Sequence, residues 1–154
     1  MYTTPYKVAS KFIGMEEVQG TVDNPQIVAM LKLDQDWPEH DEVHDEVPWC
    51  SAFMNYICWL LDLPRTEDLL ARSWLNVGRE VQLDAATIGN DIVILKRGGG
   101  DQPGPLVMNA PGHVGFFAGR KSPGAIQVLG GNQSNTVKVS TYPASRILGI
   151  RRIL

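Results

Sequence analysis

The apolar residues of the first half of the chain recur with a helical period, whereas those of the second half alternate or run continuously, as in strands. The helical period predicts helices over residues 6–15, from residue 25 after an Asn24 cap, from residue 50 to 61, and from residue 67 to 77 after a Thr66 cap. Strand patterns separated by turn signals predict strands over residues 91–96, 113–119, 125–129, 136–140 and 147–153. Because the helices precede the strands, we expect an α+β fold.

The helix that begins at Cys50 is apolar nearly all round, so we expect it to be the buried central helix. Trp59 and Trp74 fall at helical spacing with other apolar residues and are predicted to lie in the core. Cys58 is predicted to be a buried free thiol. Cys50 and Cys58 would lie about 12 Å apart along one helix, which is too far for a disulfide.

Composition narrows the function without identifying it. A chain of 154 residues is long enough for one domain, 1–154, with a substantial core. Its net charge of −3 provides no basic stripe for nucleic acid. No apolar run is long enough for membrane insertion, and residues 1–5 lack the basic start of a secretory signal. We therefore expect a monomer that is synthesised in the cytoplasm without a signal peptide.

Two residues carry candidate chemistry. Cys50 stands where a proline-bounded segment turns into a helix, and a helix N-terminus favours the thiolate. His113 opens a strand directly after the Gly- and Pro-rich loop 97–112, which we expect to border the site. Each residue type alone is commonly structural. Together, in this order and placement, they predict a nucleophile and a general base.

A third polar residue is needed to hold the imidazole of His113. Asn132, in a Gly-Gly-Asn-Gln-Ser segment, is the predicted residue, and Gln133 is the second choice for the role. Trp49 adjoins the nucleophile and is predicted to line a substrate groove, with Gln133 as a second substrate-binding residue.

Further motifs extend along nearly the whole chain, in addition to Pro48-Trp49-Cys50-Ser51-Ala52-Phe53 and Gly112-His113-Val114-Gly115-Phe116. They are Ile13-Gly14 with Glu17 and Gly20, Asn24-Pro25-Gln26-Ile27, Ala71-Arg72-Ser73-Trp74, Gly89-Asn90-Asp91-Ile92-Val93 and Leu129-Gly130-Gly131-Asn132-Gln133-Ser134. In these stretches the chain resembles the papain-like cell-wall hydrolases of the CHAP and NlpC type. It is most similar to a small bacterial and phage subfamily with the Pro-Trp-Cys-Ser-Ala-Phe motif. The resemblance implies N-terminal helices packed on an antiparallel sheet of about five strands, in one catalytic domain.

The resemblance also implies roles for individual residues. Cys50 would be the nucleophile, His113 the general base and acid, and Asn132 the residue that orients the imidazole. Many CHAP domains have a glutamate two residues before the asparagine, where this chain has Gly130. The backbone N–H of Cys50 is the natural first donor to an oxyanion, and the second donor is expected from the preceding loop.

The acidic segment 34–47 precedes the nucleophile and contains His40 and His44 four residues apart. On a helix these imidazoles would share a face, as metal ligands do. Some CHAP domains bind calcium just before the cysteine, where Asp41 and Asp45 stand here, but Val43 and Val47 occupy other ligand positions. We expect a solvated acidic loop with no metal and no cofactor.

The function implied is that of a cysteine-dependent peptidoglycan hydrolase. It would be an endopeptidase that cuts an amide bond of the wall peptide, as a phage endolysin or a similar lytic factor. Bacterial peptidoglycan is the expected partner, and the cell wall or periplasm the expected site of action after release. Two alternatives stay open: an N-acetylmuramoyl-L-alanine amidase, and a non-catalytic wall-binding or phage structural module, which would not need Cys50, His113 and Asn132 together.

Overall fold

Three α-helices, four short 3₁₀ helices and six strands make up the part of the chain that the computed structural model describes, residues 2–34, 44 and 48–154. The helices are α1 (Pro5–Ala9), α2 (Pro25–Lys32), α3 (Cys50–Leu60), η1 (Ser10–Phe12), η3 (Ala71–Asn76), η4 (Leu83–Ala85) and η5 (Ala144–Arg146). The strands are β1 (Arg79–Glu80), β2 (Asp91–Lys96), β3 (Gly112–Ser122), β4 (Ala125–Gln133), β5 (Thr136–Pro143) and β6 (Ile147–Arg152). The α+β prediction is confirmed.

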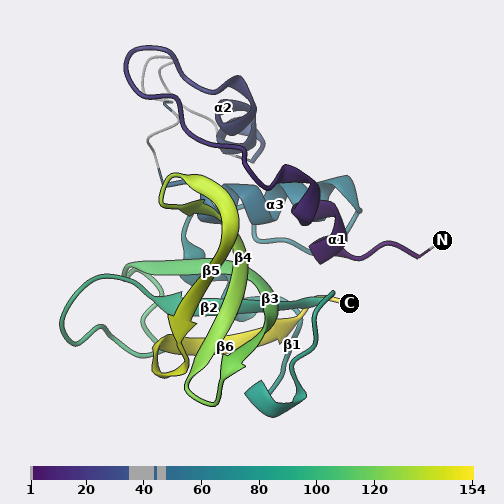
Figure 1. The fold of residues 1–154 in the computed structure, drawn as a ribbon, viewed down its shortest axis with the longest axis vertical. Coiled ribbons are helices and arrows are strands. Elements are labelled where there is room, and N and C mark those ends of the chain that lie inside the picture. The colour runs from purple at the N-terminus through teal and green to yellow at the C-terminus, as the bar shows by residue number, and fades with distance from the viewer. Residues whose placement is uncertain (1, 35–43, 45–47) are drawn as a thin grey trace.

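The strands form one antiparallel sheet with the order β1-β6-β2-β3-β4-β5. All five predicted strands are present, and the two-residue β1, which was not predicted, pairs with β6 at one edge. Figure 1 shows that the sheet is strongly curved, with α1 and α3 on one side of it and the β4–β5 hairpin curling up beside α3. The sheet therefore brings the beginning of β3 and the last residues of β4 close to the beginning of α3.

The alternation of side chains along the strands builds two clusters of apolar side chains. Ile92, Ile94, Val114 and Phe116 face the helices and join the larger cluster around α3. Residues of opposite parity, among them Val93, Leu95, Phe117 and Val128, form the smaller cluster on the other face. His113 shares the parity of Phe117, so it lies at the end of the second face.

Local capping explains where two of the helices begin. The Asn24 side chain accepts a hydrogen bond from the Gln26 N–H at 2.9 Å, and Pro25 occupies the first turn of α2, as the sequence predicts. The helix predicted over residues 6–15 is shorter, because α1 ends at Ala9 and continues as η1 to Phe12. Within the described residues, no helix combines the length and apolar character needed to cross a membrane.

The α-helix predicted over residues 67–77 is wrong. Glu67 has a φ of +56°, which belongs to the left-handed region and stops an α-helix at its start. The buried Asn55 side chain on α3 accepts hydrogen bonds from the Thr66 and Glu67 N–H groups, both at 3.1 Å. The Thr66 hydroxyl accepts from the Asp68 N–H at 3.2 Å, as a cap would, but no α-helix follows and the segment forms only the 3₁₀ helix η3.

Trp59 was predicted to lie in the core and is half exposed, at 50%. It lies near the C-terminal end of α3, where its ring packs on Tyr56 with centroids 5.9 Å apart. Trp74 is fully buried, as predicted, and its indole N–H donates to the hydroxyl of Ser51 in α3 at 2.9 Å. The helical spacing of apolar residues alone did not separate these two tryptophans. The sequence of α3 is apolar nearly all round, so it does not indicate that Trp59 lies on an exposed face.

Candidate active site

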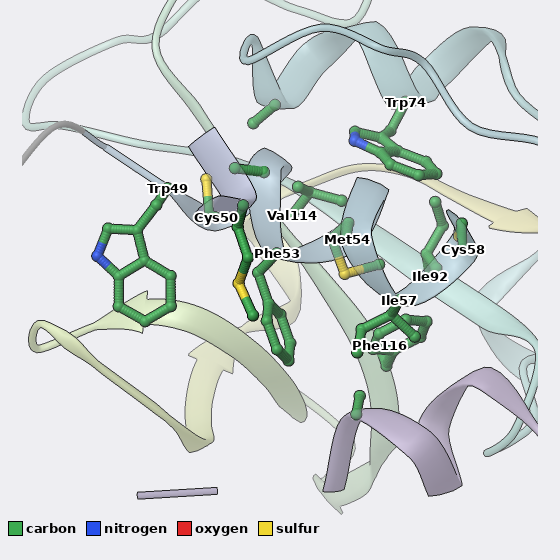
Figure 2. Packing of buried hydrophobic residues seen from close by; sticks show 14 of the residues in the cluster. Trp49, Cys50, Phe53, Met54, Ile57, Cys58, Trp74, Ile92, Val114 and Phe116 are labelled. Carbon is green, nitrogen blue, oxygen red and sulfur yellow. The ribbon is translucent and has the colours of Figure 1, made fainter. Parts of the chain in front are cut away.

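Cys50 is the first residue of α3, and the preceding Trp49 provides no side-chain cap. The first N–H groups of the helix are therefore directed to the neighbourhood of the Cys50 side chain. Figure 2 shows Cys50 in the first turn of α3, next to Trp49, with Phe53, Met54 and Ile57 following along the helix. Cys50 is only 3% exposed, but it lines a cavity together with Pro48 and Ala71.

His113, the second residue of β3, is in contact with Cys50. Burial of Cys50 favours the neutral thiol, but a hydrogen bond from the His113 side chain and the charge of the imidazole favour the thiolate. The backbone N–H of Val114 and the charge of Arg97 act in the same direction. Together these groups hold the pKa of the Cys50 thiol below its ordinary value. The two residues predicted from the sequence are thus brought together.

The third member of the site is Gln133, whose Oε1 lies 2.9 Å from Nε2 of His113. The orientation of the Gln133 amide is fixed, because its Nε2 donates to the carbonyl oxygens of Val128 and Lys138. Oε1 can only accept, so Nε2 of His113 carries the proton in this hydrogen bond. The other ring nitrogen, Nδ1, is left as the base for Cys50.

Asn132 was predicted to hold the imidazole, and the structure corrects this assignment to Gln133. The β4–β5 register shifts by one residue between Gly130 and Gln133, and Asn132 has a φ of +55°. This bulge reverses the alternation, so Gln133 shares the face of Gly130. A Cβ on Gly130 would lie 3.3 Å from Nε2 of His113. Gln133 therefore occupies the space that the missing side chain at Gly130 leaves open.

Tyr142 of β5 is a site residue that sequence reasoning missed. Its ring packs beside that of His113, with centroids 5.5 Å apart, and its hydroxyl donates to Oε1 of Gln133 at 3.0 Å. Burial raises the pKa of Tyr142 to about 12, with a contribution from the charge of Cys50, so the hydroxyl keeps its proton as a donor. The strand predicted over residues 136–140 extends to Pro143 as β5, so the sequence did not assign this side chain to the sheet.

Trp49 does not line a groove, contrary to prediction. The side chain is fully buried, and its indole N–H donates to Oε1 of Glu17 at 2.9 Å. Its ring packs directly on Gly131 of β4. Trp49 is therefore a packing residue that ties the beginning of α3 to the strand that carries Gln133. Gln133 is also buried and in contact with His113, but it lines the cavity that contains His113, so its predicted substrate contact stays a prediction.

Substituting Gly131 with alanine is expected to destabilise the protein by about 1–3 kcal/mol. A Cβ at this position would lie 2.5 Å from Cζ3 of Trp49 and 2.9 Å from Cβ of Phe53. The matched control is Gly124→Ala, because a Cβ on Gly124 meets nothing within 4 Å. Urea unfolding of both variants measures the difference. Equal stability of the two variants would show that the close packing of β4 on Trp49 is not required.

The loop 97–112 forms one wall of the cavity at Cys50, as expected, through Asn109, Ala110 and Pro111. The buried Arg72 holds this loop. Its guanidinium donates to the carbonyl oxygens of Gly104, Val107 and Pro111 at 2.8–3.0 Å. Because His113 follows the loop directly, these bonds also fix the approach of β3 to Cys50.

Cys58 differs from Cys50 in the direction in which the pKa of its thiol is shifted. It is fully buried in the core, and burial raises the pKa of its thiol to about 12. Both cysteines are free thiols. The prediction of a buried structural thiol at Cys58 is confirmed.

The acidic segment that was considered for a metal lies largely outside the described residues, and so do His40, Asp41, Val43, Asp45 and Val47. The expected second oxyanion donor falls in the same segment. His44 is described, and its Nδ1 lies 3.2 Å from Oδ2 of Asp23. Among the residues that the structure does describe, no group of three or more His, Cys, Asp or Glu side chains is arranged to hold a metal ion.

Comparison with known proteins supports the fold. No protein-family model matches the sequence, and no curated protein matches it either. Among solved structures, NlpC1 from Trichomonas vaginalis is similar over 97% of this chain, with a TM-score of 0.55 and 15% sequence identity. The match spans 42% of the NlpC1 chain, so this protein is comparable with less than half of it. The chain therefore has an NlpC-like α+β fold.

Proposed function

We propose that the protein is a cysteine-dependent amide hydrolase that acts on bacterial peptidoglycan. The observation that carries the proposal is the contact of Cys50, at the beginning of α3, with His113, whose Nε2 is held by Gln133. A nucleophile at a helix N-terminus, a base beside it and a group that orients the base are the parts of a papain-type site. The NlpC-like fold and the motif resemblance to CHAP and NlpC hydrolases supply the substrate class.

The proposed reaction has two halves. In the first, the Cys50 thiolate attacks the carbonyl carbon of the amide, and the oxyanion that forms accepts a hydrogen bond from the Cys50 N–H. His113, protonated at Nδ1, gives this proton to the leaving amine as the C–N bond breaks, which leaves a thioester on Cys50. In the second, His113 takes a proton from water, the resulting hydroxide attacks the thioester, and the thiol is released with a new carboxylate.

Gln133 and Tyr142 act on this sequence through the imidazole. The amide oxygen of Gln133 accepts from Nε2–H and fixes the tautomer that leaves Nδ1 toward Cys50. A neutral amide has no full charge to stabilise an imidazolium, so its contribution is placement of the ring. The Tyr142 hydroxyl donates to the same oxygen and limits its rotation.

The wall bond that is cut is proposed to be a peptide bond of the stem or cross-bridge. Mass spectrometry of soluble fragments from purified peptidoglycan tests this, with iodoacetamide-blocked protein as the control. New amino termini within the stem peptides are expected. Release of whole peptides from muramic acid would instead identify an amidase, and no release by either sample would favour a non-catalytic wall-binding module. A role as a phage endolysin or a similar lytic factor rests on the subfamily resemblance alone.

A further inference from the structure

Arg97 lies at the candidate active site but has no role in the proposed reaction. It follows β2 directly, its side chain is exposed, and it lines three cavities around the site. One of these also contains Cys50, another contains His113, and the third lies over Glu17 and Asn132. Arg97 thus borders the cavities of both Cys50 and His113, and its charge acts on the thiol.

The backbone on both sides of Arg97 is held by a second arginine. The guanidinium of Arg146 donates from Nε to the carbonyl of Lys96 at 3.1 Å and from its terminal nitrogen to the carbonyl of Gly98 at 2.7 Å. These hydrogen bonds fix the residues before and after Arg97. Among the described residues, Arg97 itself has no hydrogen-bond or ion-pair partner for its side chain. The backbone around Arg97 is therefore held in place, while its guanidinium is left available to bind a ligand.

The cavity beside His113 is basic, although the chain as a whole is acidic. Lys96, Arg97 and Arg146 line it, and no described acidic residue does. The chain has 14 Lys and Arg against 17 Asp and Glu, so three cations around one cavity are a local excess. Glu17, in the cavity over Asn132, is already bonded to the Trp49 indole. An anionic group on a ligand is therefore the complement that this part of the site lacks.

We propose that Arg97 is a specificity-determining residue that binds a carboxylate of the substrate next to the amide that is cut. The inference rests on the proposed function for the amide, but the preference of Arg97 for an anion can be measured at Cys50 without a peptide substrate. A substrate with a free carboxylate within about one residue of the scissile bond is then preferred over the same substrate with a primary amide at that position.

The first test needs no substrate. Cys50 is alkylated with iodoacetate, which is anionic, and with iodoacetamide, which is neutral and nearly the same size. In both reactions the thiolate displaces iodide and forms a C–S bond. The ratio of the two rates cancels any change in the thiol pKa. Substituting Arg97 with glutamine is expected to lower the iodoacetate-to-iodoacetamide ratio about tenfold, as expected for loss of one charge-assisted hydrogen bond.

The controls use charges elsewhere on the molecule. Arg79 is an exposed arginine on the edge strand β1, so Arg79→Gln removes the same charge far from Cys50 and is expected to leave the ratio unchanged. Arg97→Lys keeps the charge and is expected to give an intermediate ratio. High salt should lower the wild-type ratio, because it screens an exposed charge. A ratio that is the same in wild type and Arg97→Gln would overturn the proposal.

The second test uses peptide substrates in matched pairs. In each pair, one peptide carries a free carboxylate next to the scissile bond and the other carries a primary amide at the same position. In the first pair this group is on the acyl side of the scissile bond, and in the second pair it is on the side of the leaving amine. Wild type is expected to prefer the acid in at least one pair, and Arg97→Gln is expected to lose that preference. Equal cleavage of acid and amide in both pairs would contradict the proposal. If no peptide is cut, the proposed function fails, while the alkylation ratio still reports on Arg97.

Discussion

Substitution of Cys50 with alanine is expected to lower the rate of amide cleavage at least about a thousandfold, to the background of the assay. The reason is that the alanine side chain forms no thioester, and the remaining helix N–H groups only polarise the carbonyl. The measurement is the release of new amino groups from purified peptidoglycan. Thermal unfolding of the same variant verifies that the fold is retained.

Cys58→Ala is the matched control for this loss. Cys58 lies two turns further along the same helix and is fully buried in the core. Its removal is expected to reduce stability slightly and to leave the cleavage rate per folded molecule unchanged. Comparable clearing of the wall by wild type and Cys50→Ala would rule out thiol catalysis.

Substitution of Gln133 with alanine is expected to lower kcat/KM about a hundredfold, which is the lower range for losing a positioned general base. Without the acceptor on Nε2, the ring of His113 can turn and carry its proton on Nδ1, where it no longer accepts from Cys50. The pH at which Cys50 becomes reactive should rise together with this loss. That second readout separates a positioning role from a general loss of stability.

Asn132→Gly is the control for Gln133, because it removes the predicted side chain and keeps the positive φ that glycine tolerates. It is expected to change kcat/KM little. Tyr142→Phe, which removes one of the two hydrogen bonds to Oε1 of Gln133, is expected to fall between the two. A large loss in Asn132→Gly with an active Gln133→Ala would return the orienting role to Asn132.

The parts of this structure that sequence could predict are those with local causes. The strand patterns after residue 90 were found because alternation and turn residues act over a few positions. The helix that starts at Cys50, and the start of β3 at Gly112 next to His113, are marked by a proline and a glycine. The order of the two motifs predicts that these residues meet in space, and in the structure their side chains are in contact.

The parts that sequence could not predict depend on contacts between distant segments. Whether Asn132 or Gln133 faces His113 depends on a one-residue bulge, which pairing with β5 sets and which changes the parity of β4. The position of Trp49 depends on a glycine more than 80 residues later that makes room for its ring. Arg97 comes to the site because Arg146 holds the backbone around it.

The central claim, a thiolate–imidazolium pair between Cys50 and His113, is tested most directly by the pH dependence of Cys50 alkylation with iodoacetamide. In wild type the rate is expected to rise well below the pKa of about 8.5 of a free thiol. In His113→Ala the rise should move to higher pH, and Cys58 should stay unreactive until the protein unfolds. A wild-type rate that rises only above about pH 8, or that His113→Ala leaves unchanged, would contradict the pair.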